Sequence, residues 1–147
     1  MYLYRAIDAQ GNTRDFHLSS ARDAKATRRF FCKVLGASHT TTPRVIIADK
    51  NAAYAKALRE MKRDGIIPEG CQLRQCKYLN NLVEQDHRFI IRLVKPGTGF
   101  FSFETAWRTL QGYEAMNMIR KGQMQGVYKR NSLSQATFVA ELFGVAI

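Results

Sequence analysis

Two acidic residues stand in settings that suit metal chemistry. Asp49 ends the apolar run 45–48, Glu84 falls where a helix is expected to begin, and residues 50–83 separate the two. Mg²⁺ prefers oxygen ligands and usually takes only one or two protein carboxylates. Two such ions about 3.5–4 Å apart can hold the attacking and leaving oxygens of a phosphodiester exchange. We therefore treat Asp49 and Glu84 as candidate metal ligands.

Each acid also has a purely structural explanation. Asp49 could cap the helix that begins near Asn51, because Asp is a good N-cap residue. Glu84 could be a first-turn acid that faces the helix dipole. We favour metal ligation because the two settings occur together. Asp8 is assigned to the turn of a hairpin instead, since Asp and Gly are common turn residues and Gly11 follows it.

The charge points to a polyanionic partner. The chain has 147 residues, and its 23 Lys and Arg against 12 Asp and Glu give a net charge of +11. Solubility needs far less, so we favour nucleic acid as the partner. No apolar run approaches the roughly 18 residues of a transmembrane helix, and no secretory signal is visible, so we expect no membrane partner and a cytoplasmic location.

The cysteines do not suggest a zinc site. Cys32, Cys71 and Cys76 form no CxxC pair, and the three histidines are scattered. We interpret Cys71 and Cys76 as small apolar residues flanking a short strand.

The elements follow from periodicity and capping residues. Residues 2–7 and 13–18 predict a hairpin around Gln10-Gly11-Asn12, and Ser19-Ser20 predicts the cap of a helix over 21–35. Next come a strand at 45–48, a helix over 52–64, a strand at 71–76, and a helix from Asn80 or Asn81 to about Val94. A long helix begins at Ser102, and a short terminal helix spans about 135–143. The expected core stripe of the long helix comprises Phe103, Ala106, Trp107, Leu110, Tyr113 and Met116.

This order predicts one α/β domain with a single mixed sheet and helices on its faces. Its length is sufficient for a substantial core.

Four stretches resemble the catalytic core of bacterial insertion-sequence DDE transposases, in the subgroup that forms cointegrates. They are YLYRAIDAQGNTRDFHLS, RVIIADKNAAY, QCKYLNNLVEQDHRFI and GYEAMNMIRKGQ, and they run in register from Tyr2 to Gln123. The resemblance implies an RNase H-like, retroviral-integrase-like core over 1–123, with 124–147 as a tail. It also implies a two-metal site for Mg²⁺ or Mn²⁺, transposon-end and target DNA as partners, and a homo-oligomer for the intact protein.

The sequence departs from that pattern in two ways. The family uses three acids and carries the first on its first strand, but residues 1–8 resemble the second strand, and the preceding helix-turn-helix is also missing. We therefore expect an N-terminally truncated fragment that is inactive alone. Family members also carry basic residues where Ile91 and often Leu93 stand here, which weakens the expected grip on DNA.

Three functions remain in competition: a fragment of a transposase catalytic core, a DNA-binding or transposase-modulating fragment without catalysis, and a nuclease of the same fold. A nuclease would still need a third acid, and Asp86 points away from Glu84 on the expected helix. The outer face of helix 21–35 carries Arg22, Lys25, Arg28, Arg29 and Lys33, which fit solvation and DNA contact equally. The residues placed around a DNA track, each of which fits solvated surface equally well by itself, are Lys50, Lys77, Arg88, Arg92, Lys95, Arg120 and Lys121.

Overall fold

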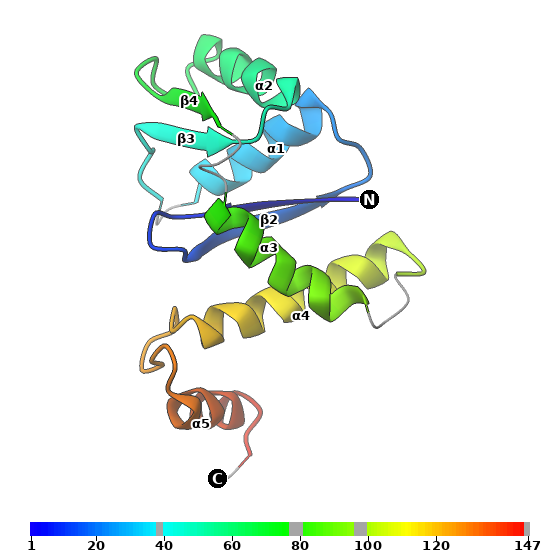
Figure 1. Ribbon diagram of the computed structural model, residues 1–147, viewed down its shortest axis with the longest axis vertical. Coiled ribbons are helices and arrows are strands. Elements are labelled where there is room, and N and C mark those ends of the chain that lie inside the picture. Colours follow the sequence, from blue (N-terminus) through cyan, green and yellow to red (C-terminus); the bar gives the residue numbers. More distant parts are fainter. Residues whose placement is uncertain (38–39, 77–80, 96–99, 146–147) are drawn as a thin grey trace. The chain divides into compact units, whose positions relative to one another are not determined.

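The structure is a computed structural model that describes residues 1–37, 40–76, 81–95 and 100–145 (Figure 1). The described residues form four strands and five helices. In chain order these are β1 (Tyr2–Ile7), β2 (Thr13–Ser19), α1 (Ala24–Leu35), β3 (Val45–Ala48), α2 (Ala52–Arg63), β4 (Gln72–Gln75), α3 (Asn81–Val94), α4 (Phe103–Arg120) and α5 (Ser132–Leu142).

The predicted α/β class is confirmed, but the single mixed sheet is wrong. The described strands form two separate two-stranded sheets, β1 with β2 and β3 with β4. No described strand lies between β1 and β3, so backbone hydrogen bonding does not continue from one sheet to the other. The chain divides into two compact units, residues 1–89 and 90–147, and the division falls within α3.

The β1–β2 hairpin is closed by a turn that Asp8 organises. The strands pair antiparallel from Tyr2 opposite Ser19 to Ile7 opposite Thr13, with a register shift between Ala6 and Ile7. One carboxylate oxygen of Asp8 accepts hydrogen bonds from the backbone N–H groups of Gln10 at 2.9 Å and Asn12 at 2.8 Å. The predicted hairpin and the turn role of Asp8 are both confirmed.

The second sheet is parallel, and helix α2 connects its two strands. Val45 lies opposite Gln72 and Ala48 opposite Gln75. Helix α2 covers almost the predicted span, because Asn51 caps its start: the Asn51 side chain accepts a hydrogen bond from the N–H of Ala53. A parallel pair needs such a crossover connection, since a tight hairpin can join only antiparallel strands.

Helix α1 starts three residues later than predicted. Asp23, not Ser20, is the N-cap, and its carboxylate accepts the N–H of Ala26 at 2.7 Å. Ser19 instead accepts a hydrogen bond from the N–H of Ala21 in the preceding loop. Ser, Asp and Asn are all good N-caps, so several candidates in succession left the helix start ambiguous.

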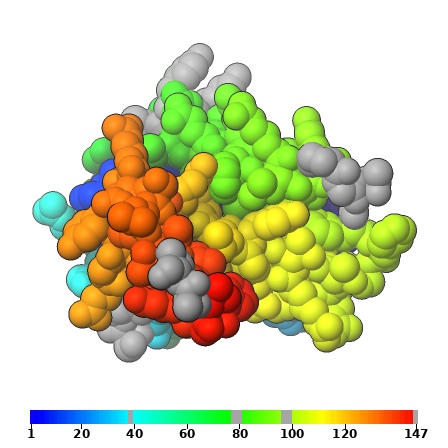
Figure 2. Space-filling model, turned by 90° about the horizontal axis from the view of Figure 1, so that it is seen from below, coloured from blue at the N-terminus to red at the C-terminus, as the bar shows by residue number. Residues whose placement is uncertain are grey.

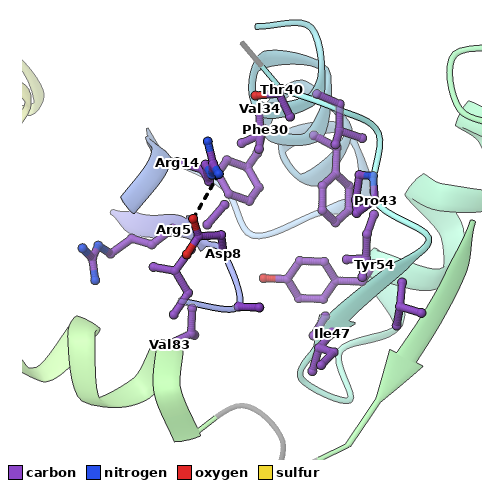
Figure 3. Close-up of a pocket in the computed structure, with 18 of the residues that line it drawn as sticks. Arg5, Asp8, Arg14, Phe30, Val34, Thr40, Pro43, Ile47, Tyr54 and Val83 are labelled. Carbon is purple, nitrogen blue, oxygen red and sulfur yellow. Dashed lines mark hydrogen bonds and ion pairs between the residues drawn. The ribbon is translucent and has the colours of Figure 1, made fainter. Parts of the chain in front are cut away.

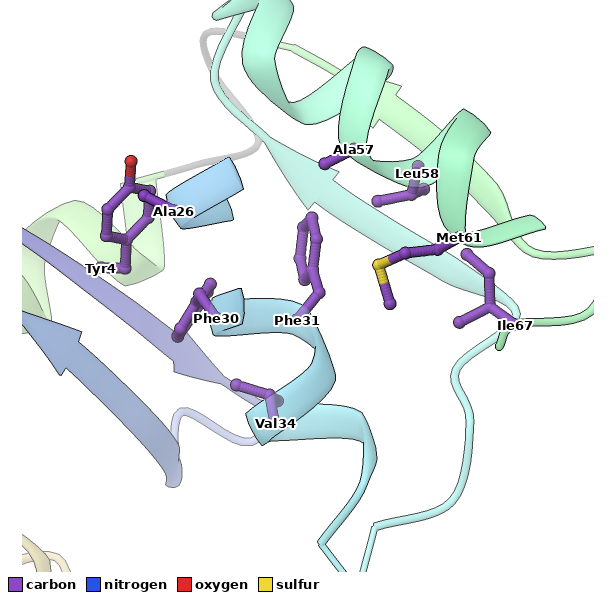
Figure 4. Packing of buried hydrophobic residues seen from close by; sticks show 9 residues of the cluster. All are labelled: Tyr4, Ala26, Phe30, Phe31, Val34, Ala57, Leu58, Met61 and Ile67. Atoms are coloured by element: carbon purple, nitrogen blue, oxygen red, sulfur yellow. The ribbon is translucent and has the colours of Figure 1, made fainter. Parts of the chain in front are cut away.

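The core of the first unit gathers around two adjacent phenylalanines of α1 (Figure 4). The Phe30 ring lies 5.6 Å from the Tyr4 ring of β1, and the Phe31 ring lies 5.9 Å from the Tyr54 ring of α2. Met61 of α2 is fully buried in the same cluster. Burying a side chain of this size stabilises the fold by about 1.5–3 kcal/mol.

The second unit contains α4, capped by Ser102 as predicted, and α5. The predicted core stripe of α4 is only partly correct. Ala106 and Leu110 are buried, but Phe103 and Met116 are about half exposed. Buried Glu114, Asn117 and Ile119 lie outside the predicted stripe. Helix α5, orange to red in Figure 2, has no fully buried residue.

In the part of the chain that the structure describes, no helix is long and apolar enough to cross a membrane.

Candidate functional site

Asp49 lies immediately after β3 and helps to shape the turn into α2. Its Oδ1 accepts a hydrogen bond from the N–H of Asn51 at 2.9 Å. Because Asn51 is the cap of α2, the interpretation of Asp49 as that cap is wrong. The Nε2 of Gln75, at the end of β4, donates to the carbonyl oxygens of Asp49 and Asn51 at 2.9 and 3.0 Å. The tip of β3 is thus braced by the neighbouring strand.

The second carboxylate oxygen of Asp49 is paired with Arg22. The Arg22 Nη2 lies 3.0 Å from the Asp49 Oδ2, and the two side chains are 49% and 42% exposed. The pair is open to solvent, so exchange of Arg22 for another cation costs little. Burial, and secondarily the charge of Asp49, raises the pKa of Tyr54 to about 12. The Tyr54 phenol therefore remains protonated beside the carboxylate at neutral pH.

Glu84 lies in the first turn of α3 and is exposed. Leu82 and Val83, which directly precede it, line the same cavity as Asp49. Asn81 is the first residue of α3. Asn80 and Lys77, which were also considered, fall outside the described residues, so the interpretation of Asn80 as a cap stays a prediction.

A buried ion pair that sequence reasoning missed fixes α3 against β1. The Arg5 Nη2 lies 2.7 Å from the Asp86 Oδ2, and the two side chains are only 2% and 11% exposed. Asp86 and Glu84 are two residues apart, which is about 200° around a helix at 3.6 residues per turn. With Asp86 facing β1, Glu84 projects away from the hairpin. An arginine within the apolar run Tyr2–Ile7 was the available signal for this pair.

Asp8 is already committed to its turn. In addition to the two backbone hydrogen bonds, its Oδ2 accepts bonds from the Asn12 side chain and from Arg14, each at 3.0 Å. Burial alone would raise the pKa of the Asp8 carboxyl, but these hydrogen bonds and the Arg14 charge outweigh it and hold the pKa below its usual value. Its role in the turn explains this carboxylate without a metal.

A cavity of about 550 Å³ opens between the two sheets of the first unit (Figure 3). Residues 5–9 of the hairpin line one side and residues 45–49 line the other. Phe30, Phe31 and Val34 of α1 contribute apolar walls, and Asp49 stands at the β3 side. The cavity is therefore a mainly apolar space with carboxylates at its margins.

The predicted DNA-contacting residues are distributed over both units. Lys50, Arg88, Arg92, Lys95 and Arg120 are exposed, and Lys121 is half-buried. Lys50 and Arg88 belong to the first unit and the others to the second, so a common DNA track stays a prediction. Of the five basic residues predicted for the outer face of helix 21–35, three pair with acids: Arg22, which precedes α1, with Asp49, Arg28 with Asp64 at 2.9 Å, and Lys33 with Asp15 at 2.7 Å.

The described residues contain no group of three His, Cys, Asp or Glu side chains placed to hold a metal ion. Cys71 is buried just before β4, where burial raises the pKa of its thiol. This agrees with its interpretation as a small apolar residue. Whether the Asp49 and Glu84 carboxylates share an ion remains a prediction.

Comparison with known proteins identifies the family. The model of the IS240 transposase DDE domain matches residues 1–123. The transposase of the insertion sequence-like element IS431mec from Staphylococcus aureus strain Mu50 is 35% identical over 120 residues, which cover 82% of this chain and 51% of that protein. The Staphylococcus aureus transposase for IS257 in transposon Tn4003 matches with the same identity and coverage.

An uncharacterised Yersinia pseudotuberculosis protein, pYV0051, is 34% identical over 65 residues, covering 44% of this chain and 61% of that protein. No solved structure matches. The chain spans about half the length of the Staphylococcus aureus relatives. With a family model over most of its length, this chain belongs to the insertion-sequence DDE transposases.

Proposed function

We propose that this chain is part of the catalytic core of a transposase that cleaves and joins DNA with divalent metal ions, and that Asp49 and Glu84 are two of its metal ligands. The observation that carries the proposal is the position of Asp49. Its half-exposed carboxylate stands at the tip of a braced strand, beside a cavity that the residues preceding Glu84 also line. The RNase H-like arrangement of the intact core is part of the same proposal.

The donor set fits Mg²⁺ or Mn²⁺, because both acids offer carboxylate oxygens. Asp49 would hold the metal through the oxygen that now faces Arg22, and Glu84 would hold it from α3. A metal bound there would stabilise charge on phosphate oxygens and activate the attacking water or hydroxyl. The chain's own contribution is to place the carboxylates and to hold the DNA with basic side chains.

Metal binding is tested with Mn²⁺ titrations followed by electron paramagnetic resonance. We expect Asp49→Asn and Glu84→Gln each to weaken Mn²⁺ binding by about tenfold or more, as loss of one charged ligand does. Glu69→Gln, at an exposed loop carboxylate outside the proposed site, is the matched control and should change nothing. Equal affinities for all four proteins would refute the assignment of Asp49 and Glu84.

We also propose that the 147-residue polypeptide does not cleave or join DNA on its own. The family's first acid has no counterpart among these residues, and Asp8 is committed to its turn. The test is strand transfer with labelled transposon-end oligonucleotides in Mg²⁺ or Mn²⁺, for which we expect no product. Product that disappears with Asp49→Ala would show that another group completes the site.

DNA affinity without catalysis is the second candidate function, and the net charge of +11 favours it. Binding through phosphates releases counterions, so affinity should fall steeply with salt and vary little with sequence. Fluorescence anisotropy with duplex DNA at 50 and 200 mM salt tests this. Arg88→Ala should weaken binding and reduce the salt slope by about one. A salt-independent affinity, or no binding at 50 mM salt, would refute this function.

A further inference from the structure

We propose that the connection between α4 and α5 binds single-stranded DNA, with the Tyr128 ring stacked on an unpaired base and the neighbouring basic side chains on the phosphates of the same strand. The connection lies wholly within the second unit, and Tyr128 falls beyond the residues that the DDE-domain model matches. The inference rests on the proposed action on DNA only for the choice of DNA over RNA.

The charged residues of this connection are all positive. Residues 115–140 contain no Asp or Glu, and their basic residues are Arg120, Lys121, Lys129 and Arg130. Lys121 is half-buried, and the other three are exposed. The nearest acids along the chain are Glu114, which is buried, and Glu141. A basic segment without neighbouring acids in the sequence attracts the phosphates of a nucleic acid.

Close backbone approach brings the basic residues together. A Cβ at Gly122 would lie 2.6 Å from the backbone nitrogen of Lys129, so the chain passes tightly against itself here. The Gln135 side chain of α5 donates hydrogen bonds to the carbonyl oxygens of Tyr128 at 3.1 Å and Arg120 at 3.5 Å. The residues that follow α4 therefore lie beside those that precede α5, and Figure 1 shows the connection folding back on itself.

Tyr128 places an exposed side chain on a fixed backbone. The residue is 67% exposed. Its N–H donates to the Ser134 hydroxyl at 3.1 Å, and its carbonyl oxygen accepts the bond from Gln135. The preceding Val127 is buried and anchors the same segment. A ring on a fixed support loses little conformational entropy when it binds, so stacking on a base is favourable.

Stacking on an exposed ring selects a single strand over a duplex. Bases inside a duplex are already stacked on one another, whereas each base of a single strand can offer its face to an aromatic side chain. A basic track beside such a ring is the usual arrangement in proteins that bind single strands. Arg130 also supports a binding role, because it is the only described residue other than glycine with a positive φ, 64°. Backbone strain of this kind concentrates at binding sites.

The test uses the full chain and a single strand of about twelve nucleotides that contains 2-aminopurine, a length within the usual site size. We expect binding, seen by fluorescence anisotropy, to quench the 2-aminopurine emission, because the Tyr128 ring stacks on the base. Tyr128→Leu should weaken binding at least about fivefold and remove the quenching, whereas Tyr128→Phe should retain both. Phe143→Leu is the matched control, at an aromatic residue of the same unit that is 73% exposed, and should change neither.

Arg130→Gly separates binding from folding. Glycine adopts a positive φ without strain, so this variant should keep its melting temperature while the salt slope of single-strand binding falls by about 0.7. Lower affinity accompanied by a lower melting temperature would mean that Arg130 serves folding, and would overturn its role.

Unchanged single-strand binding by Tyr128→Leu would overturn the proposal. An equal or larger effect of Tyr128→Leu on a duplex, or on RNA of the same sequence, would overturn the choice of single-stranded DNA. Each of these results leaves the Mn²⁺ titrations of Asp49 and Glu84 unaffected, so the inference can fail while the proposed metal site stands. Duplex binding that does not depend on Tyr128 would likewise preserve the proposed DNA affinity.

Discussion

Replacing Asp86 with Ala should destabilise the first unit strongly. The Arg5–Asp86 pair joins β1 to α3 at 2.7 Å, with side chains only 2% and 11% exposed. Breaking a buried pair by removing one partner costs about 3–5 kcal/mol, because a charge stays behind in a poorly solvated place. Because the Asp86 side chain is slightly exposed, we expect the free energy of unfolding to fall by about 3 kcal/mol, the lower end of that range. In a unit of this size, 1 kcal/mol corresponds to about 4–8 °C, so the melting temperature should fall by at least about 12 °C.

The assay is urea unfolding followed by circular dichroism, together with amide exchange of β1 and α3. Amide exchange gives the local result, because it reports the opening of β1 and α3 separately from global unfolding. Glu104→Ala is the matched control: it removes the acid of the exposed Arg108–Glu104 pair on α4, which is worth about 0.3–0.5 kcal/mol. The double substitution of Arg5→Met with Asp86→Leu should recover most of the stability, since apolar side chains replace a buried ion pair well. A loss below 1 kcal/mol for Asp86→Ala would refute the claim that this pair fixes α3 on β1.

Three further predictions follow from local structure. Asn51→Ala should cost about 1 kcal/mol in urea unfolding, because it removes the side-chain acceptor that caps α2; an unchanged midpoint would contradict this. Gly122 and Gly126 both have positive φ, but a Cβ at Gly122 would lie 2.6 Å from the backbone nitrogen of Lys129, whereas nothing lies within 4 Å at Gly126. Thermal melts should therefore show that Gly122→Ala destabilises clearly more than Gly126→Ala, and equal losses would refute the steric reasoning. Burial, aided by the charge of Lys33, lowers the pKa of His17. The unfolded chain then binds more protons than the folded one just below pH 6.5, so stability should decrease as pH falls through that range, and His17→Gln should reduce the dependence.

Local signals predicted most of the elements. The hairpin and the start of α4 were predicted because their turn and cap residues are adjacent in sequence: Asp8 closes the turn and Ser102 caps α4. Helix α2 was predicted from its helical periodicity, whereas Asp49, not the actual cap Asn51, was considered for its N-cap. The predicted start of α1 was wrong because Ser20 and Asp23 are both suitable N-cap residues, and Asp23 is the actual cap. The exposed Phe103 and Met116 show that helical spacing identifies an apolar face without identifying what covers it.

The candidate site was predictable only in part. The apolar run before Asp49 indicated a strand tip, and the structure places the carboxylate there. Neither the Arg22–Asp49 pair nor the Arg5–Asp86 pair could be predicted, because each joins segments that only tertiary packing brings together. The division into two sheets could not be predicted either, because strand periodicity indicates which face is buried but not which strands are neighbours.

The neighbouring rings of Phe30 and Phe31 have a consequence for how the two sheets are spaced. Their centroids lie 5.7 Å apart, and they continue the series of ring contacts from Tyr4 of β1 to Tyr54 of α2. Helix α1 therefore lies between β1 and α2, and the distance between them depends on the size of these two consecutive side chains. The hairpin and the parallel pair share no backbone hydrogen bond, so their separation depends on side-chain packing. Replacing Phe30 or Phe31 with a smaller side chain would therefore change the distance between these two sheets.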